Sequence, residues 1–326
     1  MSYIRHFKPD SVFLVTGGAG FIGSNIVEKL LENDFTVRVV DNFSTGKRSN
    51  IEPFLSNSSF TLIEGDIRDE KTCMESCEGV DYILHQGALG SVPRSIEDPL
   101  TSHNVNSTGT LNMLWAAHKK NVRKFVYASS SSVYGDNPDL PKVEEKTGML
   151  LSPYAATKMT NEHYASLFHQ LYGLETVGLR YFNVFGKHQD PHSVYAAVIP
   201  IFLKKLLNGE SPVIHGNGEQ SRDFTYIENV IEANLKSALS PSNVSGMAFN
   251  ISLGDRITLN KLYQVLTESL GVTIKATYGP PRPGDIMHSQ ADISKARKYL
   301  QYDPQYSFSK GIELTIDWYR ENLRGK

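Results

Sequence analysis

A glycine-rich turn near the start of the chain constrains the fold more than any other feature. Gly17, Gly20 and Gly23 give a G-x-x-G-x-x-G spacing between an apolar run at residues 12–16 and a helical pattern at residues 21–33. Glycines in such a turn allow a tight bend and a close approach of a ligand to the backbone, and the last one packs the helix against the strand. The N-terminus of the helix then offers free N–H groups to phosphate. The turn predicts a strand–turn–helix unit that binds a dinucleotide.

The first half of the chain alternates short β-rich runs with helical patterns, which predicts a doubly wound α/β fold with a parallel sheet covered on both faces. We expect strands at residues 12–16, 36–41, 60–65, 82–86, 124–130 and 175–180. Beyond residue 180 the pattern becomes irregular, and helices are expected at residues 197–208, 227–239, 259–270 and 308–323. We therefore predict a dinucleotide-binding Rossmann domain at residues 1–182 and a smaller mixed α/β substrate domain at residues 183–326, with segments free to cross between them.

Asp41 stands at the end of the second expected strand, 18 residues beyond Gly23. A carboxylate about 20 residues after the glycine turn binds the adenosine ribose in dinucleotide folds. Its charge would repel a 2′-phosphate, so the position favours NAD over NADP, although Lys47 and Arg48 stand nearby and leave NADP open. The alternative is that Asp41 only forms a turn at the strand end.

Tyr154 and Lys158 are the strongest candidates for chemistry. Ser152 and Pro153 predict the start of a helix, because serine caps helices and proline suits the first helical position. Tyr154 and Lys158 then lie four residues apart on one helix face. A phenol has a pKa of about 10, too high for a base at neutral pH, but a neighbouring ammonium and a bound oxidised nicotinamide lower it. For an isolated Y-x-x-x-K, a half-buried tyrosine and a solvated lysine would be the better interpretation.

A run of four serines, from Ser129 to Ser132, follows the fifth expected strand. It places hydroxyl groups at the carboxyl edge of the sheet, where doubly wound folds bind ligands. These hydroxyls can hydrogen-bond a substrate hydroxyl and carbonyl. A serine-rich loop alone is usually a solvated turn, so the prediction of a catalytic loop depends on its combination with Tyr154 and Lys158.

The glycine turn, the serine loop and the Y-x-x-x-K helix together resemble the extended short-chain dehydrogenase/reductase family. Further motifs spread over nearly the whole chain agree: GDIRD at 65–69, HQGA at 85–88, RYFNVFG at 180–186 and SRDF at 221–224. The segments LGSVPRS at 89–95 and HSQAD at 288–292 look like the UDP-N-acetylglucosamine 4-epimerase branch. The resemblance implies an NAD-dependent isomerase of polysaccharide biosynthesis that interconverts UDP-N-acetylglucosamine and UDP-N-acetylgalactosamine, with UDP-glucose and UDP-galactose left open as further substrates.

The resemblance also implies a role for each site residue. Tyr154 would take the proton of the sugar 4-hydroxyl, Lys158 would bind the nicotinamide ribose and lower the pKa of Tyr154, and Ser130 would hydrogen-bond the reacting sugar. Contacts to NAD are expected at Gly17, Gly20, Phe21, Ile22, Gly23, Asp41, Asn42, Phe43, Ser44, Thr45, Gly46, Asp66, Ile67, Gln86, Ala88, Tyr154 and Lys158. Contacts to the UDP-sugar are expected at Ser91, Ser130, Ser131, Ser132, Asn183, Ala197, Val198, Val213, His215, Arg222, Arg256, Arg282, Asp285 and Ser289.

The residues of the serine loop distinguish this chain from enzymes with several related activities. Dehydratases that resemble this chain carry an Asp-Glu pair there and UDP-glucuronate decarboxylases a Glu, whereas this chain has Ser131 and Ser132. A 4-epimerase of a UDP-uronic acid, UDP-glucuronate or its N-acetylated form, stays open because Arg94 could bind a carboxylate. Ser289 is small where epimerases restricted to UDP-glucose and UDP-galactose are bulky, which favours an N-acetylated sugar unless it is merely a strand residue. The intact tyrosine, lysine and serine argue against a non-catalytic NAD-sensing protein.

The bulk properties exclude other classes of function. A formal net charge of -2 and a pI of about 6.6 give no electrostatic reason to bind nucleic acid or an anionic membrane. The sequence lacks a signal peptide and a membrane-spanning run, so a cytoplasmic protein is expected. Cys73 and Cys77 are too few for a thiolate metal site and are expected to be buried, so no metal is predicted.

Relatives of this kind commonly dimerise through two helices, here residues 103–120 and 153–171, and a homodimer is expected.

Overall fold

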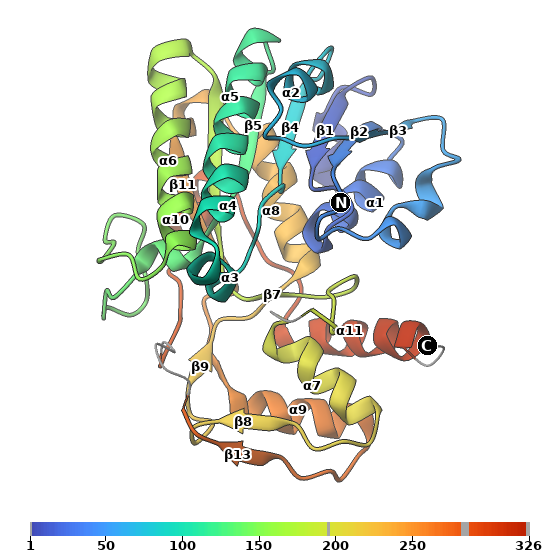
Figure 1. Cartoon of the computed structure of the whole chain (residues 1–326), viewed down its shortest axis with the longest axis vertical. Helices are drawn as coiled ribbons and strands as arrows, with labels where there is room; N and C mark the ends of the chain where they lie inside the picture. Colours follow the sequence, from blue (N-terminus) through green and yellow to red (C-terminus); the bar gives the residue numbers. More distant parts are fainter. Residues whose placement is uncertain (1, 194–195, 282–286, 324–326) are drawn as a thin grey trace.

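The computed structural model of the chain describes residues 2–193, 196–281 and 287–323. Figure 1 shows a sheet flanked by helices and, below it, a smaller part that contains helices α7 (Val198–Leu207), α9 (Leu259–Leu270) and α11 (Phe308–Leu323). The smaller part lies against one edge of the sheet. A ligand at that edge is therefore within reach of both parts.

A parallel sheet of seven strands forms the larger part, in the order β11-β6-β5-β4-β1-β2-β3. The order reverses between β1 and β4, the kind of switch point at which doubly wound sheets bind ligands. The strands are β1 Val12–Thr16, β2 Thr36–Asp41, β3 Phe60–Glu64, β4 Tyr82–His85, β5 Lys124–Ser130, β6 Glu175–Tyr181 and β11 Met247–Ile251. The doubly wound fold and its six predicted strands are confirmed, with ends that differ by at most one residue.

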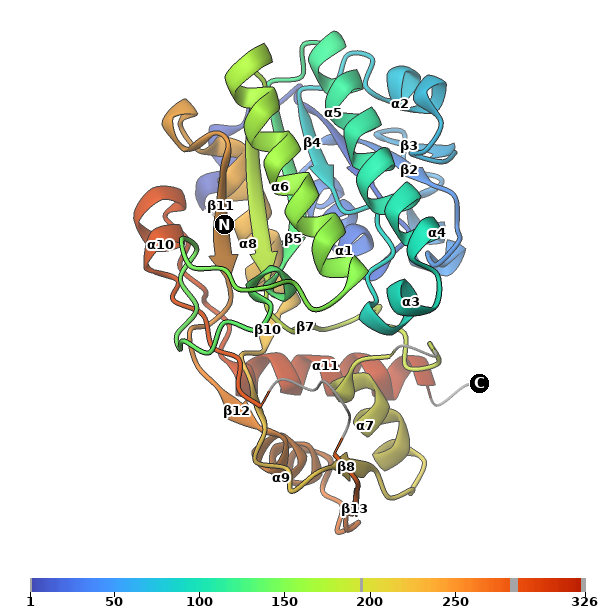
Figure 2. The same ribbon diagram turned by 60° about the vertical axis from the view of Figure 1, so that its left-hand side comes forward.

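Helices cover both faces of the sheet because successive strand residues point to opposite sides. Phe13 and Val15 pack in the core that includes α1 (Phe21–Leu31) and α8 (Ile227–Leu239). Leu14, between them, packs in the opposite core with α5 (Gly109–Lys119) and α6 (Pro153–Tyr172). Figure 2 shows α5 and α6 side by side across their face of the sheet. Burial on both faces explains why the strands are almost continuously apolar.

Short helices occupy the remaining connections of the larger part. Between β4 and β5 the chain forms α3 (Val92–Glu97), α4 (Pro99–His103) and a π-helical turn (Asn104–Thr108) that leads into α5. Helix α2 (Glu70–Ser76) packs against α5, and α10 (Ser294–Leu300) packs against β11. Single 3-10 turns are formed by Ser2–His6, Arg48–Asn50, Glu52–Phe54, Ser131–Tyr134 and Ser242–Val244.

The smaller part is held together by three two-stranded sheets and by the helices expected from the sequence. The pairs are β7 (Val184–Phe185) with β10 (Thr225–Tyr226), β8 (Val213–His215) with β13 (Thr277–Gly279), and β9 (Ser221–Arg222) with β12 (Ile257–Thr258). Strand β11 was not predicted, and with α8 it returns the chain from beyond residue 182 to the large sheet. Segments therefore cross between the two parts, and a domain division at residue 182 stays a prediction.

Two further observations bear on the class of protein. Among the described residues, no helix has both the length and the apolarity to cross a membrane, and no group of three or more His, Cys, Asp or Glu is placed to hold a metal ion. Cys73 and Cys77 are free and buried, as predicted. Burial raises the pKa of each thiol to about 12, so neither is a reactive thiolate near neutral pH.

Replacing Gly23 by alanine should damage both the fold and dinucleotide binding. A Cβ at Gly23 would lie 2.1 Å from the carbonyl oxygen of Gly17, so the turn and α1 would have to separate. We expect Gly23→Ala to lose about 1–3 kcal/mol of unfolding free energy and to bind NAD more weakly. Denaturant unfolding and NAD titration measure the two effects. Gly90→Ala is the control, because the space around that position is open; equal stability of the two variants would contradict the packing argument.

Candidate active site

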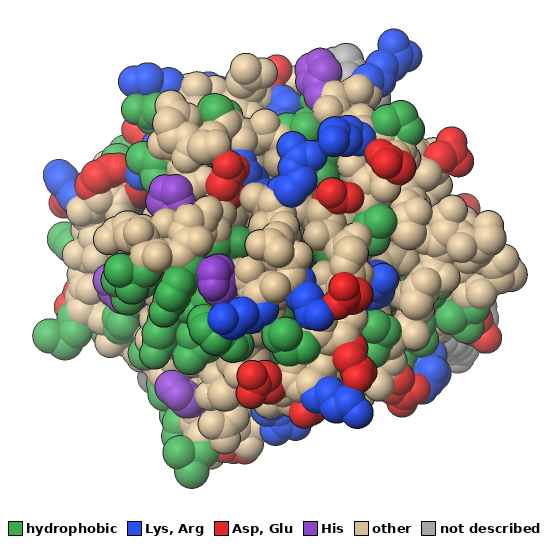
Figure 3. Space-filling model, turned by 90° about the horizontal axis from the view of Figure 1, so that it is seen from above, with side chains coloured by type: hydrophobic (Ala, Val, Ile, Leu, Met, Phe, Trp, Pro, Cys, Tyr) green, Lys and Arg blue, Asp and Glu red, His purple; other side chains and the backbone are tan. Residues whose placement is uncertain are grey.

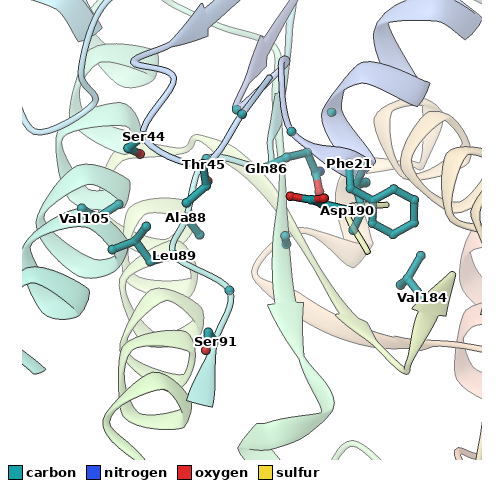
Figure 4. Close-up of a pocket in the computed structure, with 18 of the residues that line it drawn as sticks. Phe21, Ser44, Thr45, Gln86, Ala88, Leu89, Ser91, Val105, Val184 and Asp190 are labelled. Carbon is teal, nitrogen blue, oxygen red and sulfur yellow. The ribbon is translucent and has the colours of Figure 1, made fainter. Parts of the chain in front are cut away.

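A cleft of about 580 Å³ opens at the carboxyl edge of the large sheet. Its wall is formed by the ends of β2, β5 and β6, by the start of β7 and by the loops that follow β1, β3 and β4. Figure 4 shows three residues around the same space: Phe21 at the start of α1, Gln86 in the loop after β4, and Ser91, the residue before α3. Residues far apart in the sequence are thus brought together where this kind of sheet binds ligands.

The glycine turn closes one end of the cleft with bare backbone. Gly17 has a φ of +66°, and an added Cβ would lie 2.8 Å from the backbone of Gly87, so no other residue fits there. Gly20 is the N-cap of α1 and provides no side-chain hydrogen bond to the first turn. Because Gly20, Phe21 and Ile22 line the cleft, the N–H groups at this helix start are open to phosphate oxygens.

Asp41 lines the cleft and also forms a turn. One carboxylate oxygen accepts a hydrogen bond from the Ala19 N–H at 2.9 Å, and the other accepts one from the Phe43 N–H at 2.8 Å. Burial raises the pKa of Asp41, and these two hydrogen bonds only partly offset that rise. The turn considered as an alternative is therefore present, while ribose binding by Asp41 stays a prediction.

The two cations that left NADP open are both paired with carboxylates. Lys47 Nζ lies 2.8 Å from Asp190 Oδ1, and Arg48 pairs with Glu64 while its guanidinium lies over the Phe43 ring. A paired cation is a weaker partner for a 2′-phosphate, which supports NAD. Every predicted cofactor contact except Phe43 lines the cleft.

The catalytic helix begins where the sequence predicts. Ser152 accepts a hydrogen bond from a first-turn N–H of α6, and Pro153 is the first helical residue. Lys158, one turn beyond Tyr154, donates a hydrogen bond from Nζ to the carbonyl oxygen of Ala128 at 2.8 Å. The same Nζ lies 5.8 Å from the centre of the Tyr154 ring. The phenol and the ammonium thus share one side of the helix and face the cleft.

The serine loop brings two of its three predicted contacts to the cleft wall. Ser130 hydrogen-bonds the Tyr154 side chain and accepts a hydrogen bond from the Ser132 N–H at 3.1 Å. Ser131 also lines the cleft. The Ser132 hydroxyl is instead buried and has no hydrogen-bond partner among the described residues. Ser130 is therefore the serine best placed to act with Tyr154.

Burial shifts the pKa of both members of the catalytic pair. It raises the pKa of Tyr154, and the hydrogen bond with Ser130 only partly offsets the rise. It also lowers the pKa of Lys158 to about 8. The hydrogen bond with Ser130 is the contribution that lowers the pKa of Tyr154 here, and the lowering expected from Lys158 together with a bound oxidised nicotinamide stays a prediction.

A buried ion pair that the sequence analysis missed holds α6 against the sheet. Arg180, on β6, donates hydrogen bonds to both carboxylate oxygens of Glu162 on α6, at 2.9 and 2.7 Å. Ser129 also donates to Glu162. The only signals in the sequence were the position of Glu162 four residues beyond Lys158 and the arginine that opens the RYFNVFG motif, and their pairing depends on strand order.

Asn106 is a second residue that the sequence analysis missed. It lies in the π-helical turn, is fully buried, and both accepts a hydrogen bond from the Leu89 N–H at 2.7 Å and donates to the Leu89 carbonyl oxygen at 3.2 Å. It also donates to Thr157, the residue before Lys158, at 3.2 Å. Because Leu89 lines the cleft, Asn106 ties the cofactor loop to the catalytic helix. Hydrophobic periodicity carries no signal for a single π-helical turn.

The predicted substrate contacts fall into four groups. A second hollow of about 260 Å³ shares part of its lining with the main cleft and brings together Asn183, Ala197, Val198, Val213, His215 and Arg222. The main cleft is lined by Ser91, Ser130 and Ser131. Neither hollow is lined by Ser132, Arg256 or Ser289. The last two predicted contacts, Arg282 and Asp285, lie outside the described residues.

A comparison with known protein families identifies the family of the chain. A model of the family described as NAD dependent epimerase/dehydratase matches residues 13–252. The chain belongs to this family.

Individual relatives are similar in sequence to this chain along almost their whole length. A UDP-glucose 4-epimerase of Mycolicibacterium smegmatis is 34% identical over 309 residues, which cover 94% of this chain and 98% of the relative. A UDP-glucuronate 4-epimerase of Thermodesulfobacterium geofontis is 34% identical over 322 residues, covering 95% and 97%. The solved structure of a UDP-N-acetylglucosamine 4-epimerase from Methanobrevibacter ruminantium M1, in complex with UDP-N-acetylmuramic acid, has a TM-score of 0.90 and 41% identity and covers 96% of this chain and 99% of that one.

The cofactor of this epimerase/dehydratase is NAD, and the described residues fit it. The glycine turn presents bare backbone to the cleft, because a Cβ at Gly17 would collide with the backbone of Gly87, and the start of α1 lines the same cleft, where its first N–H groups can bind a pyrophosphate. Tyr154 and Lys158 line the same cleft as the turn. When bound, NAD supplies the hydride acceptor and a positive charge that favours the Tyr154 phenolate.

Tyr154→Phe tests the assigned base. The change removes the hydroxyl and keeps the ring, so we expect turnover of UDP-N-acetylglucosamine to fall about 10²–10⁴-fold while the NAD content of the purified enzyme is unchanged. Steady-state kinetics and the absorbance of released cofactor measure the two quantities. Tyr164→Phe, on an exposed part of the same helix, is the matched control. Turnover within a few-fold of that control would rule out Tyr154 as the base.

Proposed function

We propose that this chain interconverts UDP-N-acetylglucosamine and UDP-N-acetylgalactosamine through a transient 4-keto sugar. At the coarser level, the chain is an NAD-dependent UDP-sugar 4-epimerase and therefore an isomerase. The observation that carries the proposal is a cleft in which Tyr154, Lys158 and Ser130 meet beside a serine loop without a carboxylate. Such a site can move a proton and position a hydride transfer, and its serine loop has no carboxylate to act as the acid of an elimination.

The described side chains suffice for the proton transfers of this reaction. Tyr154 takes the proton of the sugar 4-hydroxyl as C4 loses a hydride, and returns the proton when the hydride comes back to the opposite face of the ring. Ser130, which hydrogen-bonds Tyr154, holds the same sugar oxygen in line with the phenol. Lys158, fixed by the Ala128 carbonyl, stabilises the phenolate electrostatically. The hydride and the proton that leave the sugar both return to it, so atoms and electrons balance without water.

The N-acetylated sugar is supported by the small side chain of Ser289. Its N–H donates a hydrogen bond to the carbonyl oxygen of Ser221 at 3.0 Å, next to Arg222, which lines the second hollow. The adjacent His288 forms a β-bridge with Ser221, so the backbone here is fixed by strand pairing. Ser289 itself lines neither hollow, so the proposal that a larger side chain at position 289 would crowd a 2-N-acetyl group is supported by its closeness to Arg222 and is tested by substitution.

A 4-epimerase of a UDP-uronic acid is the second candidate. Arg94 lies on α3 and lines the main cleft with Ser91. A guanidinium group matches a carboxylate well, because it can donate two parallel hydrogen bonds. The relative from Thermodesulfobacterium geofontis is named for UDP-glucuronate. UDP-glucuronate is therefore included among the substrates to be tested.

Substrate preference is tested with a panel of UDP-sugars and the Ser289→Tyr variant. We expect the wild type to turn over UDP-N-acetylglucosamine, and the tyrosine to depress that turnover about 5- to 100-fold more than turnover of UDP-glucose, because overpacking costs about 1–3 kcal/mol. Ser289→Ala is the control and should leave the ratio of the two rates unchanged. Equal losses on both sugars would contradict the role of Ser289. A wild type that prefers UDP-glucuronate would replace the proposed substrate by the second candidate.

We also propose that the enzyme is a homodimer that joins through α5 and α6. Tyr164, Leu167 and Leu171 are exposed on α6 at spacings of three and four residues, which places them on one side of the helix. In the space-filling view, hydrophobic side chains gather at the lower left, on the side of the molecule where α5 and α6 lie (Figure 3). An exposed apolar helix face of this kind indicates an interface.

The homodimer is tested by changing Leu167 and Leu171 together to glutamate. Two charges in an apolar interface should make the variant sediment as a monomer at concentrations where the wild type is dimeric, as measured by analytical ultracentrifugation. Leu55→Glu, at an exposed leucine away from α6, is the control and should stay dimeric. A monomeric wild type, or a double variant that still dimerises, would contradict the proposal.

A further inference from the structure

The segment that follows β7 crosses over the start of α1, the helix that ends the glycine turn. Its first residue, Lys187, accepts a hydrogen bond at its carbonyl oxygen from the Asn25 side chain at 3.1 Å. The next residue, His188, shares a hydrogen bond of 2.9 Å between Nδ1 and the Ser24 hydroxyl. Two adjacent residues of α1 therefore hold this segment, residues 187–190, which we call the crossing segment.

The crossing segment is also anchored from the side of the smaller part. The His188 ring packs edge-on against Trp318 of α11, and the carbonyl oxygen of Gln189 accepts a hydrogen bond from the hydroxyl of Tyr319. His188 has a φ of +67°, which residues other than glycine rarely adopt. Such a conformation persists only where the surroundings determine it, so the contacts to α1 and α11 fix the course of the crossing segment.

Asp190 extends from this fixed segment to the loop that follows β2. Its Oδ1 atom lies 2.8 Å from Lys47 Nζ, and both residues line the main cleft. Figure 4 shows Asp190 and Phe21, the first residue of α1, among the residues around this cleft. Burial alone would raise the pKa of Asp190, but hydrogen bonds from Lys47 and from the His192 N–H hold it below its usual value, so the carboxylate is charged. The ion pair thus joins two separate parts of the cleft wall near the phosphate-binding turn.

We propose that Lys47 and Asp190 form a clasp that slows the release of NAD from this cleft. The phosphate-binding start of α1 and the clasp border the same cavity, so a dinucleotide that leaves has to separate the two sides that the ion pair joins. The inference rests on the proposed function in one respect: an epimerase ends each turnover with its cofactor in the oxidation state in which it began. Slow release therefore does not limit turnover, whereas it would limit a dehydrogenase.

A different role for Lys47 makes a distinct prediction. If Lys47 served mainly to bind the NAD pyrophosphate, Asp190 would compete for it, and Asp190→Asn would free the lysine and slow release. If the ion pair is the clasp, the same substitution speeds release. The sign of the change in Asp190→Asn therefore separates the two roles.

The clasp is tested by the release of NADH from the full-length enzyme without any sugar. Enzyme loaded with NADH is mixed with excess NAD, and the loss of bound-NADH fluorescence gives the release rate. We expect Lys47→Ala and Asp190→Asn each to release NADH roughly two to five times faster, the range given by exposed ion pairs. The charge-reversed double variant, Lys47→Asp with Asp190→Lys, should return to within about 1.5-fold of the wild type, since it restores an ion pair.

Controls separate the clasp from general weakening of the protein. Lys205→Ala breaks an ion pair of the same 2.8 Å length and similar exposure, between Lys205 and Glu210, that does not line the main cleft; its release rate should equal that of the wild type. Raising the salt concentration should speed release from the wild type toward the rates of the single variants, because salt screens exposed charges. Unchanged release in both single variants, slower release in Asp190→Asn, or a double variant as fast as the single ones would overturn the proposal.

The two proposals can fail independently. The release rates are measured without sugar, so they do not depend on which UDP-sugar the enzyme turns over. Faster release in the single variants together with no epimerase activity would support the clasp and contradict the proposed function. Epimerase activity together with unchanged release rates would support the proposed function and contradict the clasp.

Discussion

The position of the chemistry depends on the buried ion pair between Arg180 and Glu162. Both side chains are largely removed from solvent, and removal of one partner from a buried pair costs about 3–5 kcal/mol because the other charge is left unpaired. Glu162 lies one turn beyond Lys158 and two turns beyond Tyr154 on α6. Its carboxylate also accepts a hydrogen bond from Ser129, the residue before Ser130. The Glu162 carboxylate therefore holds α6, which carries Tyr154, in place relative to the end of β5, which carries Ser130.

The same network continues to the HSQAD segment. Arg180 also donates to the hydroxyl of Tyr134 at 3.1 Å, and that hydroxyl donates to the Asn250 side chain at 2.6 Å. Asn250, on β11, donates in turn to the carbonyl oxygen of Asp292 at 3.0 Å. Asp292 belongs to the HSQAD segment that carries Ser289. Because these groups share partners, substitutions along the network are expected to be non-additive. The catalytic helix and the HSQAD segment are thus connected by one set of hydrogen bonds.

The parts of this arrangement that depend on local patterns could be predicted from the sequence. The six strands are nearly continuous apolar runs, and the start of α6 follows from Ser152 and Pro153 alone. Strand β11 was missed because MAFNI lies in an irregular region and becomes a strand by pairing with β6, which is more than sixty residues away. The roles of Asn106 and Glu162 also depend on partners that only the folded chain supplies. Sequence spacing placed Tyr154 beside Lys158, but the raised pKa of the phenol depends on depth of burial, which spacing does not report.

If Ser289 limits the size of the sugar, as proposed, its independence from the hydrogen bonds of this network would let one chemistry serve several sugars. Ser289 is held through its backbone, by the hydrogen bond to Ser221, so its side chain can change volume without removing any hydrogen bond of the Arg180 network. Tyr154, Lys158 and Ser130 would then keep their geometry whatever group the sugar carries at C2. Relatives named for UDP-glucose and UDP-glucuronate cover nearly the whole chain at similar identity, as expected if sugar preference is set by a few side chains around a shared catalytic frame. Discrimination by pocket volume is limited, since an extra group in a pocket changes binding by only about 1–3 kcal/mol. On the role proposed for Ser289, a small residue at position 289 would widen the range of sugars accepted more readily than it would restrict that range to one.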